Sequence, residues 1–417
     1  ATMNIPEQDE PFQPPEKISE PPPLLQPPFL EPPSDPSLEG GKSTNPPQPR
    51  RSLLGRIGHS VYSSFGWCFG MLSLIGGLAV VSVIPVVNLI SLGYLLYISG
   101  NIARTGRLRD GFVGVRRAGR LGGVVLGIWL VLWPARFLAA LRDSAVIVDP
   151  DHAGGWSVGL WIVTGLTCLH IIWALLRGGK LRHFAWPAPI GLIRWLGSSD
   201  KFTSTRDALW DTVAGLQLPS LFWLGARGFA GTVIWLLIPV GLMILASKIT
   251  SNAGILLSLL GGILLMGVLL FLPFLQVRFA CENRLGAFIE LIPVCRLAGR
   301  VPFKFWFALS VTLVLAVPLF LLKVELTPAE ITWLPALFFV IFGLPARMIT
   351  GWAVGRAKSK EGSNNLLWRW FCRMAALALT LPVLFSYVVI LFLSQFISWN
   401  GTRSLLEQHA FLVPSPF

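Results

Sequence analysis

Apolar stretches of membrane-spanning length recur along this chain from residue 65 onward. An α-helix rises 1.5 Å per residue, so about 20 apolar residues are needed to cross the roughly 30 Å hydrocarbon core of a bilayer. Within that core a segment must satisfy its own backbone hydrogen bonds, which favours helices for stretches this long. The sequence therefore predicts an all-α, polytopic membrane helix bundle with about nine spans. They are expected at 65–84, 86–103, 121–141, 156–176, 228–247, 253–276, 305–323, 331–350 and 374–396.

The composition excludes the main soluble classes. Of the 417 residues 53% are hydrophobic and only 13% are charged, against about 25% charged in soluble domains. The five cysteines lie far apart, so no disulfide framework or CxxC metal pattern is readable. The sequence also contains no P-loop, HExxH, GxSxG or dinucleotide-binding motif. We therefore predict no catalytic residue, no cofactor site and no metal site.

Residues 1–50 differ in character from the rest of the chain. They hold 15 of the 32 prolines, and eight acidic against three basic residues give the segment a net charge of −5. This composition is typical of a disordered, proline-rich acidic tail. A solvated spacer is the plainer interpretation of the tail, and a protein partner that binds its spaced prolines is the alternative.

Basic residues elsewhere set the expected orientation. Since the whole chain carries +13 and the tail −5, residues 51–417 carry +18. With the N-terminus inside, 27 Lys and Arg, Arg347 among them, fall in the inner loops and four fall outside. This bias predicts a cytoplasmic N-terminus and an external C-terminus. No nucleic-acid-binding motif accompanies the charge, so anionic lipid headgroups at the inner leaflet, and not nucleic acid, are the expected partner.

The spans divide into two candidate units. Residues 51–176 form the first membrane unit of about four spans, 177–227 an interfacial amphipathic linker, and 228–350 a second unit of about four spans. Residues 351–417 supply a basic loop, the ninth span and a short C-terminal tail.

Two basic linkers within these units share a pattern. Arg107-Leu108 in the first matches Arg284-Leu285 in the second, and Ala118-Gly119-Arg120 matches Ala298-Gly299-Arg300. The match predicts two parallel four-helix repeats followed by one helix. Convergence of two linkers that both lie at the inner leaflet is the alternative.

Candidate site residues are polar groups in or beside the membrane. Arg136 is expected to extend its guanidinium to the outer surface or, alternatively, to face a cavity. His170 is expected to make a hydrogen bond between helices or, alternatively, to relay protons. Seven arginines of the two linkers are the candidate lipid-headgroup contacts: Arg107, Arg116, Arg117, Arg120, Arg284, Arg296 and Arg300.

Small residues predict where helices can approach closely. Gly123 and Gly127 lie four residues apart within one expected span. Residues at that spacing share a helix face, so this pair predicts a packing seam.

Two segments resemble a known family. They read VRFACENRLGAFIELIPVCRLAGRVPFKFWFALSVTLVLAVPLFLL (277–322) and VIPVVNLISLGYLLYISGNIARTGRL (83–108). Both are similar to prokaryotic membrane proteins of the domain-of-unknown-function family numbered 4013. The resemblance implies a multi-pass architecture in the bacterial cytoplasmic membrane. That family has no assigned activity, so no site residue is carried over.

Three classes of function are compatible with these patterns. The sequence favours a non-enzymatic scaffold, assembly factor or accessory subunit, because it lacks clustered polar groups for chemistry. A transporter or permease built from parallel repeats is the alternative. A membrane-embedded enzyme is the third class.

Overall fold

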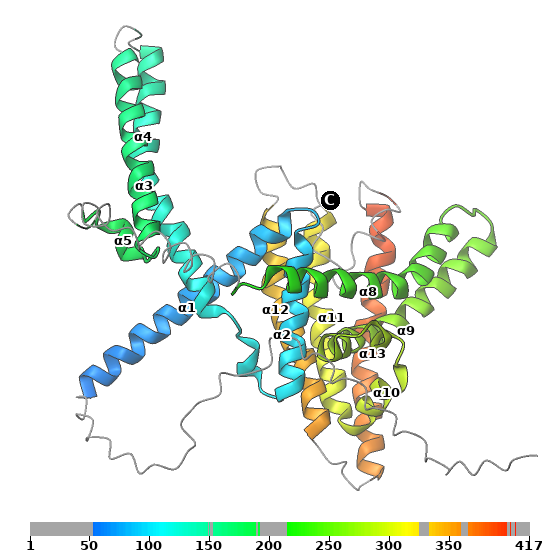
Figure 1. Cartoon of the computed structure of the whole chain (residues 1–417). Coiled ribbons are helices and arrows are strands. Elements are labelled where there is room, and N and C mark those ends of the chain that lie inside the picture. The colour runs from blue at the N-terminus through cyan, green and yellow to red at the C-terminus, as the bar shows by residue number, and fades with distance from the viewer. Residues whose placement is uncertain are drawn as a thin grey trace, which may run out of the picture. The chain divides into compact units, whose positions relative to one another are not determined.

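The computed structural model describes residues 53–148, 150, 153–188, 191, 215–324, 333–359, 366–397, 401 and 405 (Figure 1). Residues 58–417 form one compact unit, separate from residues 1–57. The expected acidic tail, 1–50, lies outside the described residues, as do 189, 190 and 192–214 of the expected linker. Within the described ranges the regular structure is helical and contains no strand.

The helices in chain order have the following bounds. They are α1 (Leu53–Val83), α2 (Asn88–Thr105), α3 (Val115–Val148), α4 (Ala153–Leu176), α5 (Leu181–Ala185), α8 (Leu218–Ala246), α9 (Asn252–Glu282), α10 (Leu291–Arg300), α11 (Pro302–Val324), α12 (Trp333–Ser359) and α13 (Leu366–Ile397). Two short 3-10 turns, η1 (Leu108–Gly111) and η3 (Leu285–Phe288), follow α2 and α9.

The predicted fold class, an all-α membrane bundle, is confirmed. Seven of the described helices are long and apolar enough to cross a membrane, or up to eight if α10 and α11, which are bent by 112° at their junction, count as one span. These helices make the chain a multi-pass membrane protein. The span predicted to begin at residue 228 corresponds to α8, which begins earlier, at Leu218, inside the expected linker.

The expected span 86–103 corresponds to α2, which is not among those seven helices. Eleven of its 18 residues are buried, including Ser91 and Ser99. Protein surrounds this helix where lipid would surround an isolated span, so it tolerates polar residues that a lipid-facing helix excludes.

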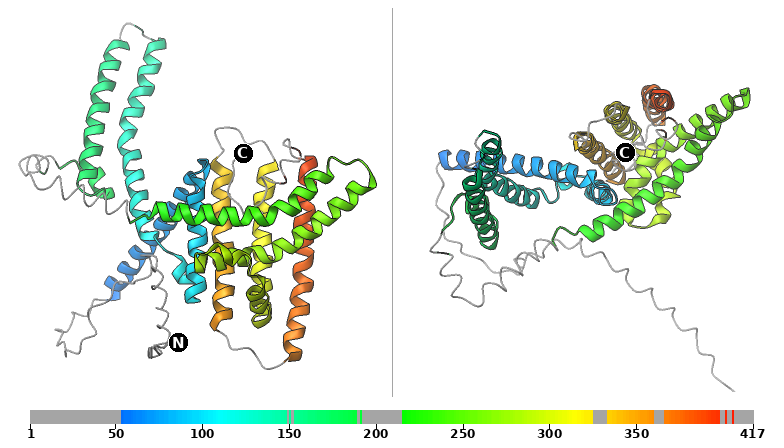
Figure 2. Two further views of the ribbon diagram at one scale, coloured as in Figure 1. Left: turned by 45° about the vertical axis from the view of Figure 1, so that its right-hand side comes forward. Right: turned by 90° about the horizontal axis from the view of Figure 1, so that it is seen from above.

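The other helices pack around α2. It contacts α8, α9 and α12, while α11 packs against α12 and α13. Figures 1 and 2 show α2, α11, α12 and α13 running alongside one another, with α8 lying across them. The core holds Leu269, Leu272 and Leu309, all without exposed surface, beside the stacked rings of Phe274 and Phe305 at a centroid distance of 3.9 Å.

Helices α3 and α4 pack against each other and against the short α5. Their outward faces carry aromatic side chains, among them Trp129, Trp133 and Trp161. Gly123 has no neighbour within 4 Å of an added Cβ, and Gly127 faces the ring of Phe184 from α5. Gly127 of the predicted packing seam therefore accommodates the ring of Phe184, and the seam does not form a contact between two long helices.

The two basic linkers begin with the same local structure. Gly106 ends α2 in the left-handed conformation, with φ of 72°, and Asn283 ends α9 with φ of 52°. Arg107 and Arg284 are both extended, and a 3-10 turn follows each. After these turns the paths diverge: η1 leads into α3, whereas η3 leads into α10 and only then α11. The local match supports the repeat, and the four-helix repeat itself stays a prediction.

Candidate functional site

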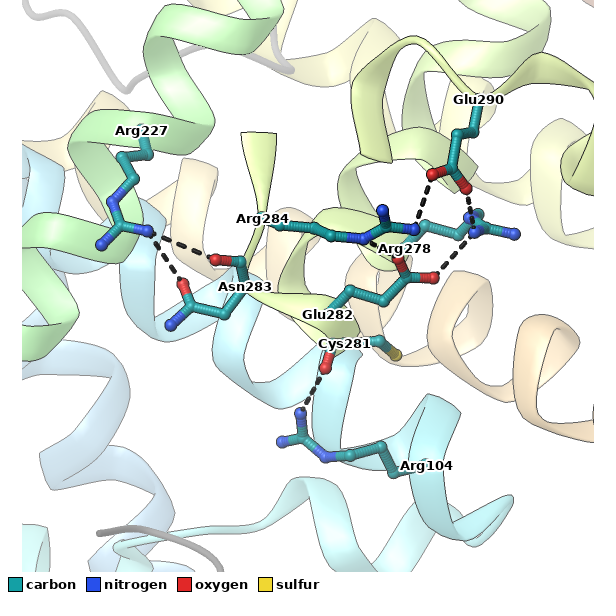
Figure 3. Close-up of polar contacts among 8 residues, drawn as sticks. All are labelled: Arg104, Arg227, Arg278, Cys281, Glu282, Asn283, Arg284 and Glu290. Atoms are coloured by element: carbon teal, nitrogen blue, oxygen red, sulfur yellow. Dashed lines mark hydrogen bonds and ion pairs between the residues drawn. The ribbon is translucent and has the colours of Figure 1, made fainter. Parts of the chain in front are cut away.

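The C-terminal end of α9 is held by arginines from two neighbouring helices. Arg104 of α2 donates from Nη1 to the carbonyl of Cys281 at 3.3 Å (Figure 3) and to that of Ala280 at 3.4 Å. Arg227 of α8 donates to the carbonyl and to Oδ1 of Asn283 at 3.3 and 3.4 Å. The last carbonyls of a helix lack partners within it and carry partial negative charge, so guanidinium groups both satisfy and neutralise them.

Two arginines and two glutamates, two of them in the last turns of α9 and two beyond it, form a closed ring at this helix end. Arg278 pairs with Glu282 at 2.7 Å and Glu290 at 2.5 Å, and Arg284 pairs with Glu282 at 2.7 Å and Glu290 at 2.6 Å (Figure 3). Hydrogen bonding and ion pairing with Glu282 raise the pKa of the Arg284 guanidinium above its usual range. Because Glu290 directly precedes α10, the ring connects the start of that helix to the end of α9.

The turn between the ring residues docks against the bundle through Phe288. Its ring lies 5.1 Å from that of Phe279. Trp235 of α8 donates its indole N–H to the Phe288 carbonyl at 3.0 Å. Gly231 leaves room for the same ring, since an added Cβ would lie 2.4 Å from it. The start of α10 is therefore attached to α8 as well as to α9.

Helix α10 has the features of a helix that lies along a membrane surface. It is bent by 112° from α11. If α11 crosses the bilayer, α10 must lie close to the membrane plane. In this helix Val294 is fully buried against the bundle, whereas Ile292 is 67% exposed and Arg296, one turn further on, is also exposed. Ile289, just before the helix, is 79% exposed. Apolar side chains next to basic ones are typical of an interfacial helix.

A groove with a volume of about 530 Å³ opens on α10 and reaches α13. Arg373 of α13 contacts α10 at Gly299, where it donates from Nη2 to the Gly299 carbonyl at 3.4 Å. An added Cβ at Gly299 would lie 2.7 Å from that same nitrogen. The lining residues are Leu291, Ile292, Cys295, Arg296, Gly299, Arg300 and Arg373.

The structure brings together only part of the predicted headgroup set. Arg296 and Arg300 line the groove, while Arg284 lies in the charge-balanced ring. The four candidates of the first linker are not among the groove residues: Arg107, Arg116 and Arg120 are exposed, and Arg117 donates to the Gly215 carbonyl. Sequence reasoning missed Arg373 as a site residue, because its distance along the chain from α10 gives no spacing signal.

The two intramembrane candidates lie in the α3–α4 pair. Arg136 is exposed on α3, and its expected extension to the outer surface stays a prediction. His170 of α4 lies half-buried, with Nε2 2.8 Å from the Phe184 carbonyl. A carbonyl oxygen only accepts, so Nε2 carries the proton and the bond joins α4 to α5. The hydrogen bond corresponds to the structural interpretation of this histidine.

A series of hydrogen-bonded polar side chains runs through the core, and the sequence patterns did not predict it. Arg347 of α12 is 6% exposed and donates from Nη1 to Oε1 of Gln276 on α9. Gln276 donates from Nε2 to Oγ1 of Thr232 on α8 at 2.6 Å, and Thr232 donates to the Gly228 carbonyl at 2.8 Å. Three helices are therefore joined by one series of hydrogen bonds.

The buried position of Arg347 corrects the sequence prediction, which counted this residue among the inner loops. Helix α12 continues to Ser359, well past the expected end at 350, so Arg347 lies near its middle. There the amide oxygen of Gln276 accepts a hydrogen bond from its guanidinium, which offsets part of the cost of burying the cation. A glutamine inside the apolar run 263–277 is a signal that could have indicated a buried polar contact, although not its partner.

Comparisons of the chain with protein-family models, with curated proteins and with solved structures find no match. The resemblance to the family numbered 4013 therefore stays an expectation. The geometry described above has to support any assignment of function.

Proposed function

We propose that this chain is a non-enzymatic scaffold or accessory subunit of the bacterial cytoplasmic membrane, with its N-terminus in the cytoplasm. The observation that supports this best is the series of hydrogen bonds from Arg347 through Gln276 to Thr232. A group that binds a transported solute or reacts with a substrate must be reachable, whereas these side chains are buried and joined to one another. Their role is to hold three helices in one arrangement.

Anionic lipids at the inner leaflet are the partner that the basic linkers favour. With Arg347 removed from the inner set, 26 Lys and Arg remain inside against four outside, so the orientation keeps its support. Arg107, Arg116 and Arg120 of the first linker are exposed, which supports the proposal that they contact headgroups. A protein that binds the proline-rich tail is a second proposed partner.

A transporter is the alternative, and one observation favours it. The helix end, extended arginine and 3-10 turn recur at Gly106 to Leu108 and Asn283 to Leu285. Proline also lies inside the continuous helices α8, α9 and α12, at Pro239, Pro273 and Pro345, where it removes a backbone hydrogen bond. Repeated units are a feature of carriers, and proline within a span is a point where such a helix can bend.

Distance measurements can separate the two classes. We expect spin labels at Ile263 on α9 and Leu379 on α13, both outward-facing positions, to give one narrow distance distribution in nanodiscs. The cysteines would first be replaced with serine, and the distribution should be unchanged by a pH or ion gradient in liposomes. A carrier must alternate between two arrangements, so two interconverting distance populations would support the transporter and contradict the scaffold.

Orientation has its own test. A cysteine at Arg109, exposed in η1, should be protected from an impermeant maleimide in intact cells, whereas one at Val148, the last residue of α3, should react. Permeabilised cells serve as the control, since both positions should then react. Labelling of the Arg109 position alone in intact cells would reverse the proposed orientation.

A further inference from the structure

We propose that the groove between α10 and α13 binds the phosphate group of an anionic membrane lipid, with Arg296, Arg300 and Arg373 as its ligands. The inference rests on the proposed placement of α10 at the inner membrane surface. It goes beyond general attraction of basic loops to the leaflet, because it names one site and adds an arginine from a different helix.

The charges around the groove favour an anion. Arg296 and Arg300 are four residues apart on α10 and share a face, and Arg373 approaches from α13. None of the described lining residues is acidic. The nearby carboxylates of Glu282 and Glu290 are held by the arginines of the ring. Three guanidinium groups repel one another, and a phosphate, which matches their planar donor geometry, removes that repulsion.

The rest of the groove favours a lipid over a small ion. Leu291 and Ile292 form an apolar part of the lining, and Ile289, two residues before Leu291 in the chain, is exposed. The volume of about 530 Å³ is in the range of sites for larger ligands and exceeds what one phosphate needs. A basic end beside an apolar side matches a phosphate headgroup joined to acyl chains.

Replacing Gly299 with alanine would change the groove without removing any charged side chain. A methyl group there would lie 2.7 Å from Nη2 of Arg373, at the free end of a flexible side chain. Gly299→Ala should therefore displace the guanidinium without disturbing the backbone. This variant separates the position of Arg373 from its charge.

Native mass spectrometry of the purified full chain can test the site. We expect the wild type to retain phosphatidylglycerol over phosphatidylcholine. Combined replacement of Arg296, Arg300 and Arg373 by glutamine should weaken retention of phosphatidylglycerol by well over about tenfold, since one charge-assisted contact corresponds to about that factor. Gly299→Ala should weaken it by a smaller factor, about threefold or more.

A matched triple variant controls for charge. Glutamine at Arg107, Arg116 and Arg120 removes three exposed arginines from the other linker and should lower retention far less. Equal losses in the two triple variants would overturn the site and leave only general attraction to the leaflet. If the groove variant unfolds in neutral lipid, Gly299→Ala decides, and wild-type retention by that folded variant would also overturn the proposal.

Competition with inorganic phosphate distinguishes a lipid headgroup from a soluble phosphate compound, because three arginines could bind the phosphate group of either one. Millimolar phosphate should not displace phosphatidylglycerol from the wild type, because it lacks the acyl chains that the apolar lining contacts. Full displacement would assign the groove to a soluble phosphate compound and overturn the lipid. All of these measurements use purified protein, so they are independent of the maleimide result, which tests orientation alone.

Discussion

Replacing Gly93 with leucine is expected to separate α2 from α8 and to destabilise the whole bundle. A Cβ at Gly93 would lie 1.8 Å from the Leu221 carbonyl oxygen, and one at Gly225 would lie 1.9 Å from that of Leu89. The obstacle in both cases is backbone, which cannot rotate aside. We expect Gly93→Leu and Gly225→Leu each to lower the free energy of unfolding by about 3 kcal/mol or more, the upper end for overpacked sites.

Thermal and denaturant unfolding in nanodiscs would measure this loss. Gly241→Leu is the matched control, because it lies on the same helix as Gly225 and has no neighbour within 4 Å of an added Cβ. Its stability should stay close to that of the wild type. If Gly93→Leu and Gly241→Leu unfold alike, the close crossing of α2 and α8 is wrong.

The second large effect is expected at Arg347. Replacing it with methionine removes the donor to Gln276 and leaves a buried amide oxygen with a lost hydrogen bond. Such a loss costs about 1–3 kcal/mol. Gln276→Leu should cost at least as much, because it removes the acceptor of a buried cation and also the donor to Thr232.

A double-mutant cycle tests the link between these side chains. Arg347→Met combined with Gln276→Leu should be less destabilised than the sum of the single variants, because an apolar pair leaves fewer unmatched polar atoms. Unfolding free energies in the same nanodiscs supply the four values of the cycle. Strictly additive effects would show that the two residues stabilise the bundle independently.

Hydropathy located most helices because a lipid-facing segment must be apolar along its whole length. The same reasoning treats α2 as one more span, although Ser91 and Ser99 are buried by protein. Small-residue spacing pointed to Gly123 and Gly127, which share one helix. A close crossing in the described bundle instead uses Gly93 and Gly225, which lie on different helices, and a local pattern carries no information about such a pair.

The sequence predicted some residues of the candidate site and missed others. Charge patterning along one linker marked Arg296 and Arg300, which the structure places in one groove. It also marked Arg284, whose charge is balanced by Glu282 and Glu290. Arg373 joins the groove because α13 returns to α10, and Arg347 is buried where α12 packs against α9, which presents Gln276. These are consequences of tertiary packing, which spacing in the sequence does not encode.

The burial of α2 has a consequence for how the chain is made. During synthesis α2 emerges long before α8 and α12, the helices that later cover it. At about 5–20 residues per second, the more than one hundred residues between α2 and α8 leave the helix uncovered for several seconds or longer. In that interval the backbone at Gly93 and at Ser99, which meets α8 and α12 in the finished bundle, stays uncovered, so α2 is expected to enter the bilayer late or to be held by the insertion machinery until its covering helices arrive.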